Sequence, residues 1–470
     1  MPTRRRDLPT PFEAPSLDVE RSAPEGTRVA RTEPERTPLP FARRKLDVAK
    51  RDVFRATRGV AASVASASRG PRSVRPDLGT MVARAERRPE RAGPELEGIY
   101  SRRTAAGKAL ALEEFGGTEE SQLAVERGLA YLASEQNDDG SWGFYRRPDA
   151  KYGRTQIGKS ALSVLAFLAS GHTQFSETNY TSNVGAAIEF LLSMQDRSTG
   201  HFGSNTTSYS HGIATYALAE AYAMTGDISL RRPLERAVTW ILMNQYLQTS
   251  DRQWYGGWGY YYPDERRVAD TWPRASVSVW QIMALKSAKI GGIDVPDIHL
   301  QAARVYLLNS FDSRRGNFRY THNPERLRTR WPTLPASTPA SVFGLLLLDH
   351  EADDPRIARG TDFVLERAPR SYRSGSDDDF VFNAVGNLYF WYYATLAMFL
   401  KGGEEWRTWN DTIRDLLVDA QNDDGSWTPI TKYAKYSGDV DGHREYTTAM
   451  CVLMLEVYYR YFTPLLDERD

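Results

Sequence analysis

Acidic side chains precede two strongly apolar segments in the second half of the chain. Asp439-Val440-Asp441-Gly442 comes shortly before one such segment, and Asp270 lies four residues before Arg274, which opens another. A carboxylic acid can donate a proton and a carboxylate can accept one, so Asp439, Asp441 and Asp270 are the candidate catalytic residues. The alternative for Asp439 and Asp441 is a polar loop whose aspartates cap a helix.

Further polar and aromatic residues lie at or near the starts of the apolar segments. A histidine there could act as a base because its intrinsic pKa lies near neutrality, although a helix cap is at least as good an interpretation. Aromatic rings could line an apolar site or stabilise a cation, but at helical spacing they are more often core. The candidate ligand-binding residues are His211, Arg274, Tyr389, Trp391, Tyr392, Tyr393 and Glu445.

The sequence predicts neither a metal centre nor a cofactor. The chain has one cysteine, Cys451, which excludes an intrachain disulfide and a cysteine-rich zinc site. His443 lies eight residues before it, about two helical turns away, so the two side chains could not bind one ion without distortion.

The elements that must position these residues alternate in character from about residue 120. An amphipathic helix keeps one face in water, whereas a helix that is apolar on all sides is buried. Each amphipathic segment is followed by an apolar one, so six pairs predict an all-α fold, an (α/α)6 toroid of outer–inner helical hairpins. The expected pairs are 121–135 with 155–170, 182–195 with 208–225, 231–245 with 274–289, 297–310 with 337–349, 355–367 with 383–400, and 407–421 with 444–462.

One heptapeptide ends both the first and the last expected outer helix. Gln136–Trp142 and Gln421–Trp427 both read QNDDGSW, and they start 285 residues apart. Asn-Asp-Asp-Gly is turn chemistry and the tryptophan can pack back on the helix ends, so the motif predicts a structural clamp. Acid chemistry by its paired aspartates is the weaker interpretation, because two copies at opposite ends of one domain cannot both be the active site. Altered copies follow other outer helices at 194–204, 254–265 and 311–322.

The pattern Q-x-x-D-G-S-W resembles the QW motif of the prenyltransferase and squalene-oxidase repeat families, and the resemblance covers about residues 120–465. These families include squalene-hopene and oxidosqualene cyclases and the beta subunits of protein prenyltransferases, which are isomerases and transferases. They share an α/α toroid around a central cavity. The resemblance therefore implies a terpene cyclase-like protein with a polyprenyl or other apolar small molecule as its ligand.

Two departures from these families leave the activity open. Squalene-hopene-like cyclases carry a DxDD acid motif at the start of an inner helix, and this sequence has none. Arg274 occupies the position that the resemblance assigns to the acid, so Asp439-Val440-Asp441 is the nearest substitute. The Asp-x-Cys pair that helps to bind zinc in prenyltransferase beta subunits is also absent.

Three functions are compatible with these features. The first is a terpene cyclase-like enzyme, and the second is a catalytically inactive, cyclase-derived binding or scaffold protein. The third is a carbohydrate-active (α/α)6 enzyme that uses two carboxylates, such as Asp270 with Asp441 or Glu445.

Residues 1–103 differ in composition from the expected toroid at 104–470. They contain 21 Arg and 2 Lys against 14 Asp and Glu, a balance of +9, so the rest of this neutral chain carries −9. This Arg- and Pro-rich segment is expected to be a disordered tail that makes at most a weak contact with an acidic surface, with no specific nucleic-acid partner. No secretory signal and no apolar run of membrane-spanning length is found, so a cytoplasmic protein is expected.

Overall fold

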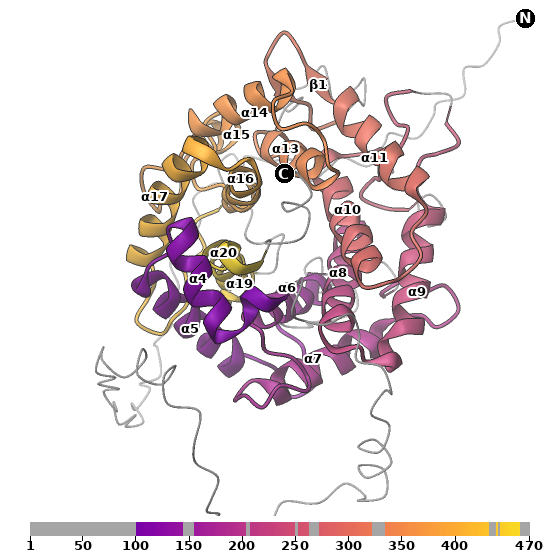
Figure 1. The fold of residues 1–470 in the computed structure, drawn as a ribbon, viewed down its shortest axis with the longest axis vertical. Coiled ribbons are helices and arrows are strands. Elements are labelled where there is room, and N and C mark those ends of the chain that lie inside the picture. Colours follow the sequence, from indigo (N-terminus) through magenta and orange to yellow (C-terminus); the bar gives the residue numbers. More distant parts are fainter. Residues whose placement is uncertain are drawn as a thin grey trace, which may run out of the picture. The chain divides into compact units, whose positions relative to one another are not determined.

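The computed structural model describes residues 100–143, 155–203, 207–249, 252–262, 272–321, 334–431, 439 and 442–460. All of them belong to one of two compact units of the chain, the unit that spans 82–470. Within these residues the fold is an all-α toroid of two concentric rings of helices, as the sequence predicts (Figure 1).

The inner ring consists, in the described part of the chain, of six helices. Each packs against the next, and the last packs against the first, which closes the ring (Figure 1). Every residue of the first and fourth inner helices is buried, which explains why these segments are apolar on all sides. The inner helices are α6 (Gln156–Ala169), α8 (Ser208–Thr225), α10 (Ala275–Ile290), α13 (Ser337–Leu347), α16 (Leu388–Lys401) and α19 (Glu445–Leu455).

The outer helices bury only one face. In α14 the buried residues Ile357, Gly360, Thr361 and Val364 recur at three- and four-residue spacing, so one stripe faces the inner ring. The side chain of Thr118 caps the start of α5, and that of Asp354 caps α14. The outer helices are α5 (Glu119–Ser134), α7 (Thr181–Met194), α9 (Ile228–Met243), α11 (Asp297–Asn309), α14 (Pro355–Leu365) and α17 (Gly403–Asp419).

Several shorter elements lie outside the hairpin pattern. A 3-10 helix, η1 (Ser101–Arg103), precedes α4 (Ala105–Phe115), and α20 (Val457–Arg460) continues α19. The remaining ones are α15 (Asp377–Phe382) and the antiparallel pair β1 (Phe311–Asp312) and β2 (Asn317–Phe318).

The described chain begins four residues before the expected domain boundary. The sequence assigns 100–103 to the tail, whereas Tyr100 and Arg103 are buried in the helical domain. The rest of the expected tail lies outside the described residues. Among the helices that the structure describes, none combines the length and apolar character needed to cross a lipid bilayer.

The repeated heptapeptide is a clamp, as predicted. The rings of Trp142 and Trp427 are fully buried, and their indole N–H groups donate to the carbonyl oxygens of Leu132 (2.6 Å) and Leu417 (2.8 Å). Both carbonyls lie in the last turn of the preceding outer helix. Each tryptophan therefore packs against a helix end.

The clamp glutamines connect neighbouring outer helices. The Gln136 amide donates to the carbonyl of Asn183 on α7 (2.9 Å), and the Gln421 amide donates to that of Ala124 on α5 (2.8 Å). Gln421 therefore joins the last outer helix to the first. The altered copy at 194–204 keeps this contact, since Gln195 donates to the carbonyl of Pro233 on α9 (2.9 Å).

The clamp glycines are required by their backbone conformation. Gly140 and Gly425 have φ angles of 85° and 89°, which favour glycine. A Cβ at either position would lie 2.3 Å from a carbonyl oxygen of the next outer helix, that of Ala186 or Arg127. The turn therefore lies directly against the neighbouring helix.

Candidate functional site

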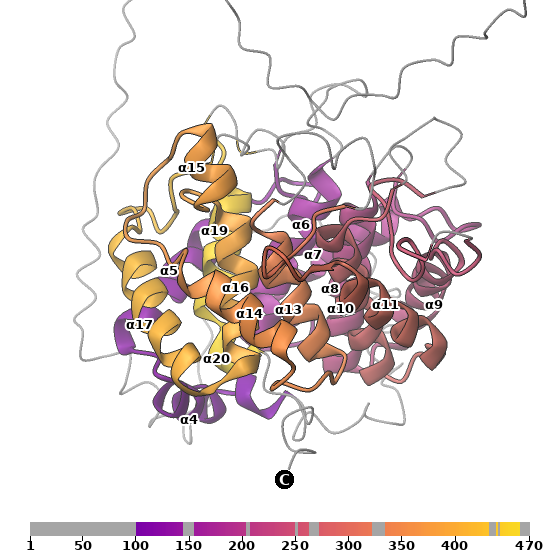
Figure 2. The ribbon, with the colours of Figure 1, turned by 90° about the horizontal axis from the view of Figure 1, so that it is seen from above.

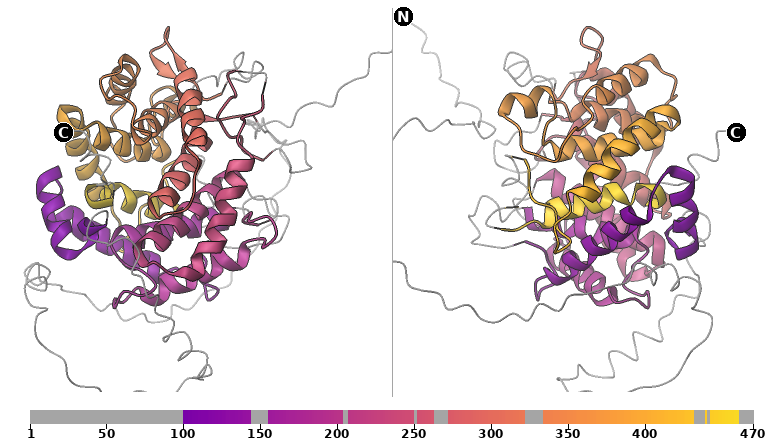
Figure 3. Two further views of the ribbon diagram at one scale, coloured as in Figure 1. Left: turned by 45° about the vertical axis from the view of Figure 1, so that its right-hand side comes forward. Right: turned by 90° about the vertical axis from the view of Figure 1, so that its left-hand side faces the viewer.

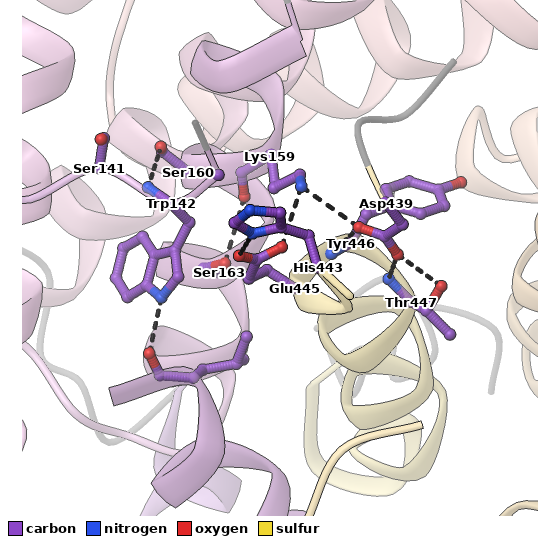
Figure 4. A network of polar contacts seen from close by, with 12 residues as sticks. Ser141, Trp142, Lys159, Ser160, Ser163, Asp439, His443, Glu445, Tyr446 and Thr447 are labelled. Atoms are coloured by element: carbon purple, nitrogen blue, oxygen red, sulfur yellow. Dashed lines mark hydrogen bonds and ion pairs between the residues drawn. The ribbon is translucent and has the colours of Figure 1, made fainter. Parts of the chain in front are cut away.

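A charged cluster joins the starts of the first and last inner helices. It consists of Lys159 on α6, Glu445 at the start of α19, and Asp439 and His443 just before α19. The Lys159 ammonium lies 3.2 Å from Oδ1 of Asp439 and 3.0 Å from Oε2 of Glu445 (Figure 4). All three side chains are almost fully buried, with exposed fractions of 2%, 0% and 2%. We call this end of the toroid, where the inner helices begin, the N-terminal end of the inner ring.

Both carboxylate oxygens of Asp439 contact hydrogen-bond donors. Oδ2 accepts from the Thr447 amide (2.8 Å) and hydroxyl (2.6 Å), and Oδ1 accepts from the Tyr446 amide (3.1 Å) beside Lys159. A carboxylate offers about four lone-pair sites, and these four donors occupy them. Burial raises the pKa of Asp439, against the effect of Lys159 and Thr447. Asp439 thus caps the first turn of α19. Because donors occupy all of its lone-pair sites, none is left to carry a proton that points to the ring centre.

Glu445 is held as a carboxylate. Its Oε2 contacts Lys159, and its Oε1 accepts from Nδ1 of His443 at 2.7 Å. Burial acts to raise the pKa of Glu445, but Lys159 and the His443 hydrogen bond outweigh it and lower the pKa below its ordinary value. The ion pairs of the cluster therefore connect α6 with α19 at neutral pH.

An aromatic cluster lies at the same end on three other inner helices, α8, α10 and α16. It consists of Tyr209, Trp280, Tyr389, Tyr392 and Tyr393. Tyr209 donates to the Ser276 hydroxyl (2.7 Å), and Tyr389 donates to the Ser276 carbonyl (2.9 Å) and accepts from the Trp280 indole (3.0 Å).

The residues of the aromatic cluster differ in burial. The rings of Trp280 and Tyr392 stack with their centroids 5.6 Å apart, and both are fully buried. Tyr209 and Tyr389 are half-buried, and burial raises their pKa well above the ordinary value, so both phenols are neutral. The exposed parts of these two side chains are the surface that the cluster can offer to a ligand.

Arg274 adds a fixed cation beside the aromatic cluster. It precedes α10, is almost fully buried, and donates to the Trp272 carbonyl at 2.6 Å. Its guanidinium carbon lies 5.4 Å from the ring centroid of Tyr260 and 5.3 Å from that of Tyr320. These distances are typical of cation–π contacts.

Two candidate ligand-binding residues point away from both clusters. Nδ1 of His211 accepts from the Phe202 amide (3.3 Å), and its Nε2 lies 3.1 Å from the Ala237 carbonyl on α9, to which it can only donate. Burial lowers the pKa of His211 well below its ordinary value, so this neutral imidazole connects α8 to the outer ring. The ring of Trp391 is buried and lies 5.9 Å from that of Tyr372.

The structure brings the candidates together only in part. It groups Asp439 with Glu445, and separately it groups Tyr389, Tyr392 and Tyr393 near Arg274. Asp270 and Asp441 lie outside the described residues. Within the described ranges, no three histidine, cysteine or carboxylate side chains are grouped closely enough to hold a metal ion.

Sequence reasoning missed Lys159 and Arg460. Lys159 is the one charged residue in the apolar segment 155–170, and that isolated charge was the available signal. Arg460 donates to the hydroxyls of Tyr392 on α16 (3.3 Å) and Tyr216 on α8 (3.4 Å). These helices are three places apart in a ring of six, so Arg460 spans the middle of the ring, and all three side chains are buried there.

Comparisons with known proteins show the fold and no more. No family model matches the sequence, and no curated protein does. An alpha-1,6-mannanase from a Salegentibacter species, solved with alpha-1,6-mannotriose, is 10% identical over 73% of this chain and 99% of its own, with a TM-score of 0.50. The type II terpene cyclase MstE from Scytonema, solved with geranylgeranyl dihydroxybenzoate, is 14% identical over 72% and 97%, with a TM-score of 0.49. At 10% identity the likeness to the mannanase shows the fold alone, and a fold does not define a function.

Proposed function

We propose that this protein binds an apolar, isoprenoid-type small molecule at the N-terminal end of its inner ring and does not cyclise it. The observation that carries this proposal is the state of Asp439, whose carboxylate oxygens are occupied by four donors. The protein is then a terpene cyclase-like toroid that acts by binding.

Cyclisation started by protonation requires a neutral carboxylic acid in a dry site, with its proton free to reach an alkene. Asp439 is buried, but Lys159 lies 3.2 Å from it and favours the carboxylate. Arg274 supplies a second buried cation next to the aromatic cluster. A fixed positive charge there would repel a developing carbocation, so both charges argue against this chemistry.

The aromatic cluster supports an apolar ligand. Tyr209 and Tyr389 are each the second residue of an inner helix, and Tyr446 is the second residue of α19. All three are half-buried, and the hydroxyls of Tyr209 and Tyr389 donate to Ser276. The exposed parts of these side chains would pack against a hydrocarbon chain, which gains free energy from the apolar surface removed from water.

A carbohydrate-active site fits the described residues less well. Glycosidases place an acid and a base on opposite sides of the scissile bond, several ångströms apart. Asp439 and Glu445 instead contact the same Lys159 ammonium, and both are buried. The likeness to the mannanase concerns the fold, so we do not extend its substrate to this chain.

Two measurements test the proposal. The purified protein is incubated with squalene and shorter polyprenyl compounds, and products are sought by mass spectrometry, while binding is followed by tryptophan fluorescence with a dansyl-labelled farnesol probe. We expect binding without turnover. Tyr389→Ala should weaken binding about tenfold or more, whereas Tyr222→Ala, at the other end of α8, should not.

Cyclised products would contradict the proposal. If turnover is lost in Asp439→Asn, Asp439 is an acid after all and the argument from its occupied lone pairs is wrong. If turnover survives that substitution, the acid lies elsewhere. Absence of binding for every isoprenoid would remove the proposed ligand class.

A further inference from the structure

The segment that enters the helical domain closes the opposite end of the inner ring. Arg103 donates to the Glu220 carboxylate on α8 at 2.5 Å, to the Arg460 carbonyl at 3.2 Å and to the Leu168 carbonyl at 3.4 Å. These partners belong to α8, α20 and α6. One side chain thus connects two inner helices with α20, which continues the inner helix α19.

This contact lies where the inner helices end. Leu168 is the second-last residue of α6, and α4 lies at the same end of the toroid as α20, opposite α15 (Figure 2). The carbonyl end of a helix carries partial negative charge and favours a cation. Tyr100 is buried beside Arg103, with its ring centroid 4.6 Å from the guanidinium carbon. We call residues Tyr100–Arg103 the plug.

The helix that follows the plug contacts α20 near its start, where the Lys108 ammonium lies 5.5 Å from the ring centroid of Tyr459, and it is anchored again at its far end. Ala111 is the one buried residue of α4, and Leu110 is 65% exposed. At the end of α4, the Phe115 ring lies 5.0 Å from that of Phe399, and the Trp406 indole donates to the Phe115 carbonyl. The plug can therefore move while the end of α4 stays attached.

The contact that the plug makes with the inner ring is buried but includes an ion pair, that of Arg103 with Glu220. An ion pair removed from water gains little net free energy, because desolvation of both charges offsets their attraction. Nε of Arg103 is buried without a hydrogen-bond partner, so it would gain one from water on release. Glu220 would keep its hydrogen bond from the Ser287 hydroxyl (2.7 Å). The free energy needed to release the plug is therefore smaller than its burial alone suggests.

We propose that the plug is a releasable closure of the C-terminal end of the inner ring. In the closed state Arg103 pairs with Glu220, and in the open state Arg103 and Tyr100 leave the ring while Phe115 anchors α4. Opening admits solvent and small molecules to the inner ring from this end. This closure is independent of the ligand site proposed at the N-terminal end.

Limited proteolysis of the full chain tests this closure, because trypsin cleaves after arginine only in an accessible backbone. Glu220→Gln removes the charge that holds Arg103 and keeps the shape of the side chain. We expect cleavage after Arg103 to become about tenfold faster or more. The melting temperature should change little, and hydrogen exchange should rise in residues 216–225 without rising in α13. Tyr100→Ala should accelerate the same cleavage without touching the ion pair.

Glu235→Gln is the matched control, since Glu235 pairs with Arg231 at 2.9 Å on the exposed face of α9, outside the plug, and should not affect cleavage after Arg103. Unchanged cleavage in both Glu220→Gln and Tyr100→Ala would overturn the proposal. It would also be overturned if cleavage accelerates equally at all sites with a lower melting temperature, because the plug would then open only when the whole domain unfolds.

Discussion

Replacing Trp427 with alanine measures how much the clamp stabilises the ring. The indole is fully buried, donates to the Leu417 carbonyl at 2.8 Å, and lies against Gly128 of α5. Truncation of a buried tryptophan costs about 3–5 kcal/mol, because apolar burial is lost and a cavity remains. The Leu417 carbonyl would also lose its indole partner, which adds about 1–3 kcal/mol if water cannot reach it. We therefore expect a loss at the upper end of the 3–5 kcal/mol range.

The free energy of unfolding is measured by urea titration followed by circular dichroism. Trp142→Ala should cost about the same, since its indole makes the equivalent bond to Leu132. Phe382→Ala is the negative control because Phe382 is 50% exposed. A loss at Trp427 within about 0.5 kcal/mol, the range of ordinary surface substitutions, would refute the clamp.

Three further perturbations test the interpretation of single residues. Lys159→Met should destabilise the protein by about 3–5 kcal/mol, because it leaves two buried carboxylates without the ammonium that they share. Replacing both carboxylates with amides in the same chain should restore part of the loss. Gly140→Ala should destabilise more than Gly292→Ala in thermal melts; both glycines have positive φ, but nothing lies within 4 Å of a Cβ at the latter. Burial lowers the pKa of His201 to about 4 and that of His211 well below its ordinary value, so the unfolded state binds more protons than the folded state. The free energy of unfolding should therefore fall as the pH drops below about 6.5. A free energy of unfolding that does not change with pH in this range would contradict the prediction.

The helices could be predicted because each segment carries its own burial pattern. The expected inner helix 208–225 has the same bounds as α8. The fifth inner helix was expected from 383 but begins at Leu388, because Ala384 and Gly386 take positive φ and the Asn387 side chain caps the first turn. Helix α4 was not anticipated, and with one buried residue it has no apolar stripe to detect.

The site was harder to predict because its contacts are distant in sequence. Neighbouring residues in the sequence are enough to predict that Asp439 precedes an inner helix and that Glu445 begins it. They also suggest the capping role that the structure supports for Asp439. Lys159, which forms ion pairs with both carboxylates, lies 286 residues from Glu445. No pattern of neighbouring residues predicts that Lys159 and Glu445 form an ion pair. The position of Arg460 between opposite inner helices likewise depends on the closure of the whole ring.

The distribution of the clamps follows from this closure. Neighbouring hairpins inside the ring are linked by the chain, so little entropy is lost when they meet, whereas the first and last hairpins must close a loop of nearly the whole domain. The two unaltered heptapeptides belong to these hairpins, whose outer helices α5 and α17 pack side by side (Figure 3). Gln421 donates to α5 there, Arg127 donates back to the Asn422 carbonyl at 2.7 Å, and Lys159 pairs with Glu445 across the inner helices. The junction between the first and last hairpins is therefore where the chain lacks a covalent connection and where side chains must supply the contact, which explains why the charged cluster at this place can be structural.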